Sequence, residues 1–574
     1  MKKWEKREKV TTLEDLFEQR SGSRFEIENY LSAELPMINN LEKIAKRLLS
    51  LLVGNVIVIF TDYDADGMTS AIILLNTLQY LAALASKLTG KEPSQILLGM
   101  PDRLRGGYGF QTKDVNEQNA VYILLDNGIV QYDAIQKAVD NNCEVIVIDH
   151  HEGGEKLPNA DIVCDPKVTG AEYTNYCAAG LTFRLAHRML HEPWVNKVCS
   201  EERDELERNN LFIAAVGTVG DVVPVLYENR TIIKEGLRAI PEYWQPVVDI
   251  LMRGNTDRLS EQDIAFKITP AFNAVGRMGQ LDPEFMRMLM SNASIEDRRK
   301  ASMVMEDLNA KRKNLTEKGL NAIQSKLYDA DASVIVVQDD TIHPGVVGIV
   351  AGKLGEEHRK PVFVFGPVDE NGNLTASARN KGSDKVSLKA ILDEVNKTVP
   401  LVKYGGHQAA AGVTIRAEDL ETFRNACCEA AKETEADNQW IYDFDLDQNA
   451  NWFQAYDRIR QFAPYGQGNP EPVFRVVFNP TPESVEVMGA GSRHVKMLNK
   501  GQNRAVCFNF GDKKDEIRYA AAEKKPLVIY GTLNENCYQG GREIQLVAED
   551  IEFPEKDKHA FQLKAQKKLA ALLA

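Results

Sequence analysis

The sequence has little cysteine, no long apolar run and no excess of positive charge. Its eight cysteines include one adjacent pair, Cys427 and Cys428, but no C-x-x-C pair. That pattern excludes a zinc ribbon or a disulfide scaffold and favours a reducing compartment. No segment approaches the roughly 18 consecutive apolar residues of a membrane helix, and the charged N-terminus lacks the apolar core of a secretory signal. We therefore expect a soluble, cytoplasmic protein that is not associated with a membrane.

Acidic residues outnumber basic ones, and the net charge is −14. This argues only weakly against a nucleic-acid partner, because binding depends on the local charged patch rather than on net charge. A cluster of carboxylates that holds metal ions would itself add negative charge. The 574 residues are 44% apolar and 26% charged, an ordinary globular balance. At roughly 150 residues per domain they predict three to four domains.

Residues 1–50 are charged and are expected to be helical, with apolar residues spaced to suit one packed helix near the end of this segment. Beyond them, short apolar runs alternate with helix-like stretches. Such runs are typical of strands buried on both faces, so the alternation predicts a parallel sheet with helices on both sides. The expected strands are 56–60, 96–100, 121–125 and 145–148, and the expected helices are 68–84 and 131–141.

The rest of the chain divides by composition. A long charged segment without proline predicts an extended helix that links two domains, and a new α/β unit follows it. Short β-type runs separated by Gly, Asn and Pro then predict a small barrel, and the C-terminal tail is typical of a basic amphipathic helix. The expected boundaries are 51–294 for the first domain, 295–330 for the linking helix, 331–440 for the second, smaller α/β domain, 455–553 for the barrel and 554–574 for the tail.

Three carboxylates, Asp62, Asp64 and Asp66, follow the first buried strand at alternate positions. The same pattern opens an EF-hand calcium loop, but that loop needs a preceding helix and a Glu at position 12, where this chain has Ile73. The pattern instead favours a metal site at the carboxyl end of a parallel strand, where α/β folds bind ligands. For this segment alone, a solvated acidic turn remains the alternative.

Three further motifs place possible ligands after other expected elements. Asp126 closes the strand 121–125, Asp149-His150-His151 closes the strand 145–148, and Asp221 follows a helical apolar stretch. Each is weak alone, since an Asp often caps a helix. Together they offer the ligands of two neighbouring divalent ions with one bridging carboxylate. Mixed carboxylate and imidazole ligands suit Mn²⁺ or Mg²⁺ better than zinc. Two such ions can clamp the attacking and leaving oxygens of a phosphoester.

With these motifs in order, the chain resembles the DHH phosphoesterase superfamily and, within it, the RecJ family of single-strand-specific DNA exonucleases. The resemblance runs from about residue 50 to residue 553. It implies an α/β fold with a parallel-sheet DHH catalytic domain, a long linking helix, a DHH-associated domain and a C-terminal OB-type β-barrel that binds nucleic acid. The strings that carry it are DYDADG, LLDNG, DHH, GTVGDVVP, FNAVGRMG, HPGVVGIVAGKL, GGHQAAAG and YGQGNPEPVF.

The resemblance implies roles for the metal motifs. One ion would be held by four ligands, and Asp62 or Asp64, with Asp126 bridging, would hold the other. Which of Asp62 and Asp64 binds directly stays open. Asp149 would orient a histidine ligand and His151 would face the phosphate, while a metal-bridging water attacks the phosphorus. The four ligands of the first ion are Asp66, Asp126, His150 and Asp221.

The resemblance also implies cations and donors for phosphate. Arg277 would contact the scissile phosphate, with Asn273 and Asn309 as polar supports. His407, with Gly405 and Gly406, would bring the second domain onto the nucleotide. The terminal 5′ phosphate would be bound by Arg103, Ser377 and Arg379; without the resemblance, a surface salt bridge is the alternative reading of the two arginines.

The chain departs from the family pattern in a few places. Thr61 stands where the family often has Gly, and Ala376 and Asn380 stand where it usually has Gly and Ser. The last two flank the expected 5′-phosphate pocket, so end specificity is less secure than hydrolysis.

The function implied by the resemblance is 5′-to-3′ degradation of single-stranded DNA to 5′ mononucleotides by two-metal hydrolysis, in DNA repair and recombination. It also implies a monomer, with a single-strand binding protein and a helicase as partners. One alternative is a DHH phosphodiesterase of short oligoribonucleotides or cyclic dinucleotides, which the barrel disfavours. Another is a catalytically inactive replication or repair scaffold, which the filled ligand positions disfavour. The choices between Mn²⁺ and Mg²⁺ and between DNA and RNA stay open.

The expected barrel carries aromatic residues on which bases could stack. Aromatic residues in strands more often belong to a core, which is the alternative for each of them. The candidates are Phe474, Phe508, Phe510 and Tyr538.

Overall fold

The computed structural model describes residues 3–21, 37–102, 108–198, 201–254, 259–324, 326, 332–381, 386–431, 439–538 and 541–553. The chain forms two compact units. One joins the N-terminal residues up to Glu26 with the residues from Asn438 onward, and the other comprises Ile27–Asp437. The predictions for Arg103 and for the tail 554–574 lie outside the described residues.

The first domain of the Ile27–Asp437 unit is built on a parallel sheet, as predicted, with five strands where four were expected. Its strand order is β3-β2-β4-β5-β6. The apolar runs pair in parallel register, with Ile57 opposite Val121 and Ile123 opposite Ile146. The short β6 was not predicted. The strands are β2 (Val56–Thr61), β3 (Gln95–Gly99), β4 (Val121–Leu125), β5 (Glu144–Ile148) and β6 (Ile162–Cys164).

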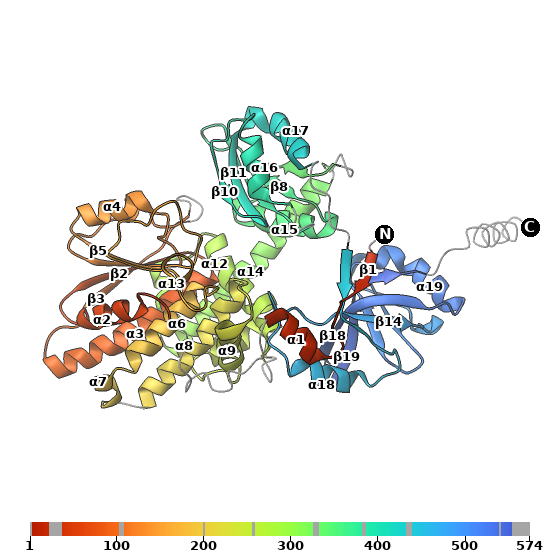
Figure 1. Cartoon of the computed structure of the whole chain (residues 1–574), viewed down its shortest axis with the longest axis horizontal. Coiled ribbons are helices and arrows are strands. Elements are labelled where there is room, and N and C mark those ends of the chain that lie inside the picture. Colours follow the sequence, from red (N-terminus) through yellow and green to blue (C-terminus); the bar gives the residue numbers. More distant parts are fainter. Residues whose placement is uncertain are drawn as a thin grey trace, which may run out of the picture. The chain divides into compact units, whose positions relative to one another are not determined.

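Helices cover both faces of this sheet (Figure 1). The helices α2 (Leu41–Ser50), α3 (Ala65–Thr89), α6 (Ala178–Leu190) and α8 (Glu201–Gly220) build the larger core on one face. On the other face, α4 (Tyr132–Asp140) packs over a second apolar cluster. Among the described helices, α3 alone is long and apolar enough to cross a membrane, but 78% of its most apolar window is buried in this core.

The remaining helices of the domain are short, and they lead into one long helix. The linking helix α14 (Ile295–Gln324) begins after Ser294, whose hydroxyl accepts a hydrogen bond from the backbone of Asp297. The sequence predicted this helix, although it placed the end several residues later. The other elements are η1 (Thr112–Asp114), α5 (Pro166–Thr169), α7 (Pro193–Asn196), α9 (Tyr227–Gly236), α10 (Gln245–Leu251), α11 (Glu261–Asp263), η2 (Ile264–Ile268), α12 (Thr269–Arg277) and α13 (Pro283–Arg287).

The second domain has a five-stranded mixed sheet in the order β10-β11-β9-β8-β7, in which only β7 and β8 pair in parallel. Apolar clusters lie on both faces, one beneath α15 and the other beneath α16 and α17. The elements are β7 (Ile335–Gln338), η3 (Pro344–Val346), α15 (Val347–His358), β8 (Val362–Phe365), β9 (Asn373–Arg379), α16 (Leu388–Val395), β10 (Lys403–Gly406), β11 (Ala410–Arg416), η4 (Ala417–Asp419) and α17 (Leu420–Ala431).

The other unit contains a seven-stranded sheet in the order β13-β14-β18-β19-β17-β16-β15, which encloses its own apolar core. Short β-type runs expected from the sequence at 484–488, 505–510, 527–530 and 544–548 overlap β15, β17, β18 and β19. The elements are β12 (Gln439–Tyr442), β13 (Phe444–Asp445), α18 (Trp452–Arg460), β14 (Phe474–Phe478), η5 (Pro482–Ser484), β15 (Glu486–Met488), η6 (Ala490–Ser492), β16 (His494–Leu498), β17 (Arg504–Cys507), η7 (Gly511–Lys513), α19 (Lys514–Ala522), β18 (Leu527–Tyr538) and β19 (Gly541–Glu552).

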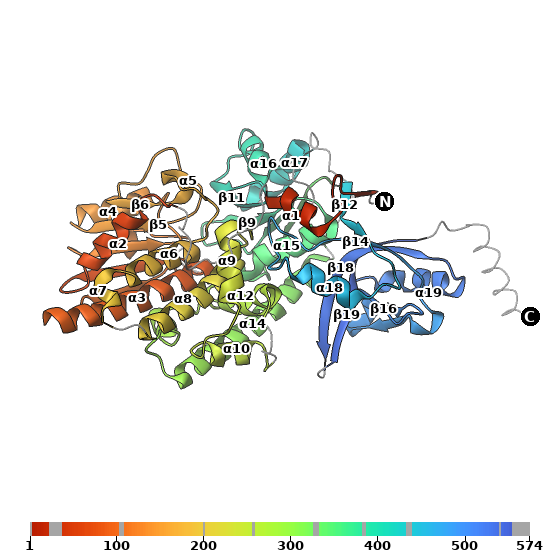
Figure 2. The same ribbon diagram turned by 60° about the horizontal axis from the view of Figure 1, so that its bottom comes forward.

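The N-terminal residues differ from the helical segment that the sequence predicted. Strand β1 (Lys3–Lys6) pairs in parallel with β12. The ring of Trp4 stacks on Tyr530 at 4.3 Å, and its indole N–H donates to Asp550 at 2.8 Å. Helix α1 (Leu13–Ser21) follows and joins the same unit. A four-residue strand is too short for its alternating pattern to be recognised in the sequence. The predicted packed helix is α2, which lies in the other unit (Figure 2).

Candidate metal centre

The parallel register brings the ends of three strands together. Thr61 lies opposite Leu125, and Leu125 lies opposite Ile148, so the residues that follow these strands are neighbours at one edge of the sheet. Asp62, Asp126 and Asp149 stand at these positions, and all three are buried. This places them at the carboxyl ends of the strands, as the sequence predicted.

The turn after β2 is tight because of one glycine. A Cβ atom at Gly67 would lie only 2.6 Å from the carbonyl oxygen of Asp62, so a larger residue would push the strand and α3 apart. Asp64 begins α3 and accepts hydrogen bonds from the backbone N–H groups of Asp66 and Gly67 at 3.0 and 3.1 Å. The turn therefore holds three carboxylates at alternate positions, and the backbone hydrogen bonds fix the direction of the Asp64 carboxylate.

The carboxylate of Asp66 is held by the start of another helix. Its two oxygens accept hydrogen bonds from the backbone N–H groups of Ala178 and Ala179, both at 2.8 Å. These N–H groups are unpaired donors of the first turn of α6, where a negative charge is favoured. At Gly217, a Cβ atom would lie 2.3 Å from the hydroxyl of Thr69, so α8 can approach α3 only because this residue is glycine. That approach brings the end of α8, and Asp221 after it, to the same site.

His150 faces the carboxylates with one ring nitrogen. Its Nε2 lies 3.2 Å from Asp126 Oδ1, 3.5 Å from Asp66 Oδ2 and 3.7 Å from Asp221 Oδ2. The ring also donates a hydrogen bond to the backbone carbonyl of Tyr176. Burial, and then the charge of neighbouring His151, lower the pKa of His150 to about 3. The neutral ring is the form that binds a metal ion.

His151 has a different environment. Burial alone would lower its pKa, but the hydrogen bond and the charge of Asp149 raise it to about 9. The Nδ1 atom lies 2.7 Å from Asp149 Oδ1, and the hydroxyl of Tyr108 lies 3.3 Å from Nε2. Asp149 itself accepts hydrogen bonds from the backbone of Ile129 and His150 at 3.0 and 2.8 Å. His151 is therefore a fixed, positively charged group beside the carboxylates.

The carboxylates of this cluster fit a pair of divalent cations. Burial, followed by repulsion from neighbouring carboxylates, raises the pKa of Asp66 to about 7 and the pKa values of Asp126 and Asp221 well above the ordinary range. Buried carboxylates repel one another in this way unless cations lie between them. Their ligand atoms form overlapping sets within 4.8 Å: Asp62, Asp64 and Asp126; Asp66, His150 and Asp221; and Asp126, His150 and His151.

Helix α12 supplies the neighbouring polar groups. Asn273 accepts a hydrogen bond from the backbone of Ala65 at 2.8 Å and so supports the start of α3. Arg277, one turn later and half-buried, ends the helix. Gly276 beside it packs against the backbone of Tyr63, because a Cβ atom there would lie 2.1 Å from that carbonyl oxygen. These contacts hold the end of α12 against the turn that carries the first carboxylates.

Asn309 lies further along, on the buried side of α14. Its amide oxygen accepts hydrogen bonds from Arg312 at 2.9 and 3.0 Å. Burial lowers the pKa of Arg312. The described contacts of Asn309 thus support a cation on its own helix, and the sequence reasoning did not identify Arg312.

In the second domain, Ser377 and Arg379 project from β9 toward the first turn of α15. A Cβ atom at Gly348 would lie 3.1 Å from both Ser377 Oγ and Arg379 Nη2. The neighbours that depart from the family pattern, Ala376 and Asn380, are buried. Ala376 alternates to the other face of the strand, where it packs in the apolar core. A hydroxyl, a guanidinium and a helix N-terminus therefore converge at one place.

The sequence GGH lies at the edge strand of the second sheet. Gly405 and Gly406 end β10, and His407 follows them and is exposed. The Glu152 carboxyl has a lowered pKa, chiefly because it bonds Lys167, and the charge of His407 also contributes. The charges of His407 and Glu152, the residue that follows the Asp-His-His motif of the first domain, are therefore close enough to interact.

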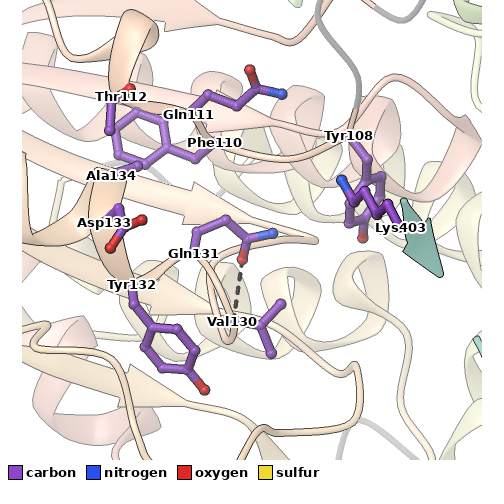
Figure 3. Close-up of a pocket in the computed structure, with 10 residues that line it drawn as sticks. All are labelled: Tyr108, Phe110, Gln111, Thr112, Val130, Gln131, Tyr132, Asp133, Ala134 and Lys403. Atoms are coloured by element: carbon purple, nitrogen blue, oxygen red, sulfur yellow. Dashed lines mark hydrogen bonds between the residues drawn. The ribbon is translucent and has the colours of Figure 1, made fainter. Parts of the chain in front are cut away.

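A pocket of about 580 Å³ opens beside the cluster (Figure 3). Tyr108, which contacts His151, lines it together with Lys403 from β10. Most of the other lining residues come from the loop before η1 and the start of α4. The sequence reasoning missed Tyr108, although it lies in the same Gly-rich string as Arg103, and it missed the backbone donors of α6, for which no sequence signal exists.

The stacking candidates in the other unit separate by exposure. Phe474 is buried and belongs to the core, and Phe510 packs against that core, which corrects the sequence hypothesis for both. Phe508 is 45% exposed and lies edge-on to the ring of His494 at 5.3 Å. The side chain of Tyr538 lies outside the described part. Phe508 is the one described candidate with an open face.

Three family descriptions match the chain. They are the DHH family, N-terminal domain over residues 56–218, the DHHA1 domain over residues 331–433 and the RecJ OB domain over residues 442–550. The predicted order of an α/β DHH domain, a DHH-associated domain and an OB-type domain is thereby confirmed.

The chain is also similar to proteins named single-stranded-DNA-specific exonuclease RecJ. It is 31% identical to that of Bacillus subtilis over 512 residues, which cover 86% of this chain and 61% of the relative. It is 30% identical to that of Thermus thermophilus over 508 residues, covering 88% and 69%. With the Escherichia coli protein it shares 25% identity over 563 residues, covering 92% and 93%. The match thus spans about three fifths of the Bacillus protein.

Two solved structures of Thermus thermophilus RecJ are similar to this chain. The complex with Mn²⁺ has a TM-score of 0.74 at 26% identity and covers 91% of this chain and 73% of the other. The complex with Mg²⁺ has a TM-score of 0.69 at 25% identity and covers 92% and 72%. Both structures contain divalent cations, which is the class of ion that the carboxylate sets of this chain fit.

Proposed function

The chain belongs to the RecJ family of single-stranded-DNA-specific exonucleases, and from this premise we propose that it shortens single-stranded DNA from the 5′ end, releasing 5′ mononucleotides. The proposal depends on two neighbouring ligand sets, which are Asp62, Asp64 and Asp126 in one and Asp66, His150 and Asp221 in the other. Asp126 of the first set lies 3.2 Å from His150 of the second. In this proposal Asp66, His150 and Asp221 would hold one Mn²⁺ or Mg²⁺ ion, Asp62 or Asp64 would hold the other, and Asp126 would serve as a ligand of both. Ions of this class polarise a phosphodiester and lower the pKa of water.

The protein's own groups would orient the phosphate. His151 carries a positive charge at neutral pH, because Asp149 raises its pKa to about 9, and so it can donate to a phosphate oxygen. Asp149 orients that ring through Nδ1. Arg277, at the end of α12, would give a bidentate contact to the scissile phosphate. Asn273 and Asn309 would act indirectly, the first by supporting the start of α3 and the second by supporting Arg312.

The preference for the 5′ end would come from the second domain. Ser377 and Arg379 meet the first turn of α15, which is a suitable place for a terminal phosphate. Each cut breaks the bond between phosphorus and the 3′ oxygen of the released nucleotide and leaves a new 5′ phosphate on the strand. The same pocket would therefore bind the next end. Gly405, Gly406 and His407 would close on the nucleotide from β10.

The alternatives make different demands on the chain. A phosphodiesterase of short oligoribonucleotides or cyclic dinucleotides has no use for a nucleic-acid-binding OB domain. A catalytically inactive scaffold has no need of complete ligand sets. Free cysteines at all six described positions support a reducing, cytoplasmic location, which is part of the proposal. A single-strand binding protein and a helicase as partners, and a monomeric state, remain predictions.

The test is a time course on a 5′-phosphorylated, 3′-labelled single strand with Mn²⁺. The same strand in a duplex, its 5′-hydroxyl form and an RNA of equal sequence are run beside it. We expect progressive shortening from the 5′ end of the DNA single strand, fastest with the 5′ phosphate. The Asp126→Asn chain should be inactive, whereas Asp140→Asn, an exposed carboxylate at the end of α4, should match the unchanged chain.

The outcomes separate the alternatives. Activity on cyclic dinucleotides alone, with the polymer intact, would favour the small-substrate phosphodiesterase. No hydrolysis with any substrate, by a chain whose melting temperature still rises with Mn²⁺, would favour the scaffold. Equal rates on strands with and without a 5′ phosphate would leave the hydrolysis intact but remove the proposed role of Ser377 and Arg379.

A further inference from the structure

A second group of metal-ligating side chains lies in the first domain, away from the carboxylate cluster. His187 and His191 are one helical turn apart at the end of α6, and Glu207 lies on the facing side of α8. The three ligand atoms are all within 4.8 Å of one another. His187 lies nine residues beyond Ala178, which is about 13 Å along the helix from the end that holds Asp66.

The geometry aims three ligands at one point. Glu207 pairs with His187 through one carboxylate oxygen and lies 3.7 Å from His191 Nε2 through the other. The Nδ1 atom of His191 lies 2.9 Å from the backbone carbonyl of His187, which directs Nε2 toward Glu207. The two imidazole rings lie 4.2 Å apart. A backbone contact that fixes the tautomer of a ligating histidine is a common feature of metal sites.

Among the described residues, the nearby cation Arg188 pairs with other carboxylates and not with this group. These carboxylates are Glu42 and Glu192, and Glu207 forms ion pairs with the two histidines. The side chains of His187 and Glu207 are 16% and 12% exposed and that of His191 is 39% exposed. An ion can therefore enter from solvent and keep water as a further ligand.

We propose that His187, His191 and Glu207 form a second, separate site for a transition-metal ion of the Zn²⁺ class. Two imidazoles and one carboxylate suit Zn²⁺, Co²⁺ or Ni²⁺, whereas Mg²⁺ prefers oxygen ligands. The two nitrogens distinguish this site from the oxygen-rich catalytic cluster. The ligands come from two helices, so the ion would join the end of α6 to the first half of α8.

That position connects the site to the catalytic cluster through two packed helices (Figure 2). The start of α6 donates two hydrogen bonds to Asp66, and the end of α8 leads to Asp221. An ion at the far ends of these helices would fix their relative position. Its first effect is on the stability of the domain, because anything that binds only the folded state raises its melting temperature.

The test uses Zn²⁺ alone as the probe on the full chain without a histidine tag, in excess Mg²⁺. The Asp126→Asn chain is the background, because Asp126 belongs to two of the three catalytic ligand sets. Zn²⁺ stoichiometry is measured by equilibrium dialysis, and Co²⁺ is added separately to record the visible absorption of a low-coordinate nitrogen site. We expect one Zn²⁺ per chain and a melting temperature several degrees higher than without Zn²⁺.

Three variants in that background decide the result. His191→Ala removes the most exposed ligand, and Glu207→Gln keeps a polar partner for His187 while removing the charge; each should weaken Zn²⁺ binding on the order of tenfold or more. Glu205→Gln, an exposed carboxylate on the same helix, should bind like its parent. Equal Zn²⁺ binding by all three variants would overturn the proposal, as would the absence of Zn²⁺ binding in the Asp126→Asn chain.

Discussion

The first and second domains both place helices on two faces of a five-stranded sheet, but their strands run differently. In the first domain every neighbouring pair is parallel, so the carboxyl ends of β2, β4 and β5 meet at one edge. In the second domain only β7 and β8 are parallel, and the neighbours of β9 both run against it. The ends of neighbouring strands there point in opposite directions.

The difference decides how each sheet can build a site. A parallel edge collects a residue from each of several strand ends, which is how Asp62, Asp126 and Asp149 become neighbours. A mixed sheet cannot do this, and its polar groups come from one face of a single strand. Ser377 and Arg379 are two residues apart on β9 and so share a face. The parallel edge suits two neighbouring metal ions, and the face of a single strand suits one phosphate group.

The largest effect should follow from removing a ligand at the parallel edge. We expect His150→Ala to lower kcat at least on the order of 100-fold. Removing a residue that only supports a metal ligand lowers activity by up to about 100-fold, and removing a ligand itself should cost at least as much. His150 faces three carboxylates through one ring nitrogen, and it belongs to two of the three ligand sets. Single-turnover cleavage in saturating Mn²⁺ measures the loss.

The same loss should occur on 5′-phosphorylated and 5′-hydroxyl strands, because the parallel edge acts on the bond that breaks. His358→Ala, at the end of α15, is the matched control and should cleave normally. A His150→Ala chain that retained more than a tenth of the rate would contradict the assignment of His150 as a metal ligand.

A smaller and more selective effect is expected from the second sheet. Arg379→Ala should raise KM for a 5′-phosphorylated strand at least about tenfold, since a charge-assisted bond to phosphate contributes about 1.5–3 kcal/mol. The 5′-hydroxyl strand should be cleaved as before, so the preference for a phosphate should disappear. Steady-state kinetics on the two strands measure this ratio. A fall in kcat on both strands would instead connect β9 to the chemical step.

Much of this contrast could be predicted from the sequence, because strand ends can be located by apolar runs. Asp126 and Asp149 follow such runs directly, and their strands were identified within one residue. The same reasoning could not find the backbone N–H groups of Ala178 and Ala179, since any residue type provides them. It also missed β1, whose pairing with β12 joins residues more than 400 positions apart.

Other parts of the site depend on tertiary contacts that no local pattern encodes. Tyr108 contacts His151 only because the loop before η1 returns to the sheet edge. Phe474 and Phe508 are both aromatic residues of the same unit, yet the first is 6% exposed and the second is 45% exposed. Composition identified both as stacking candidates, and only the fold separates them.

The smallest expected effect concerns the pocket beside Tyr108, where both domains contribute residues (Figure 3). Lys403, at the start of the edge strand β10, is exposed and would contact DNA phosphate as a simple point charge. Lys403→Ala should weaken single-strand binding only a few-fold at moderate salt. The slope of log affinity against log salt should become shallower by about 0.7, the value for one phosphate contact on a single strand.

Binding titrations over a range of NaCl concentrations measure that slope, with Ca²⁺ in place of Mn²⁺ so that the strand stays intact. Lys397→Ala, an exposed lysine that pairs with Glu394 in the same domain, is the matched control and should leave the slope unchanged. An unchanged slope for Lys403→Ala would mean that the strand does not pass this pocket. DNA would then contact the second domain through β9 and the GGH end of β10, and not through the start of β10.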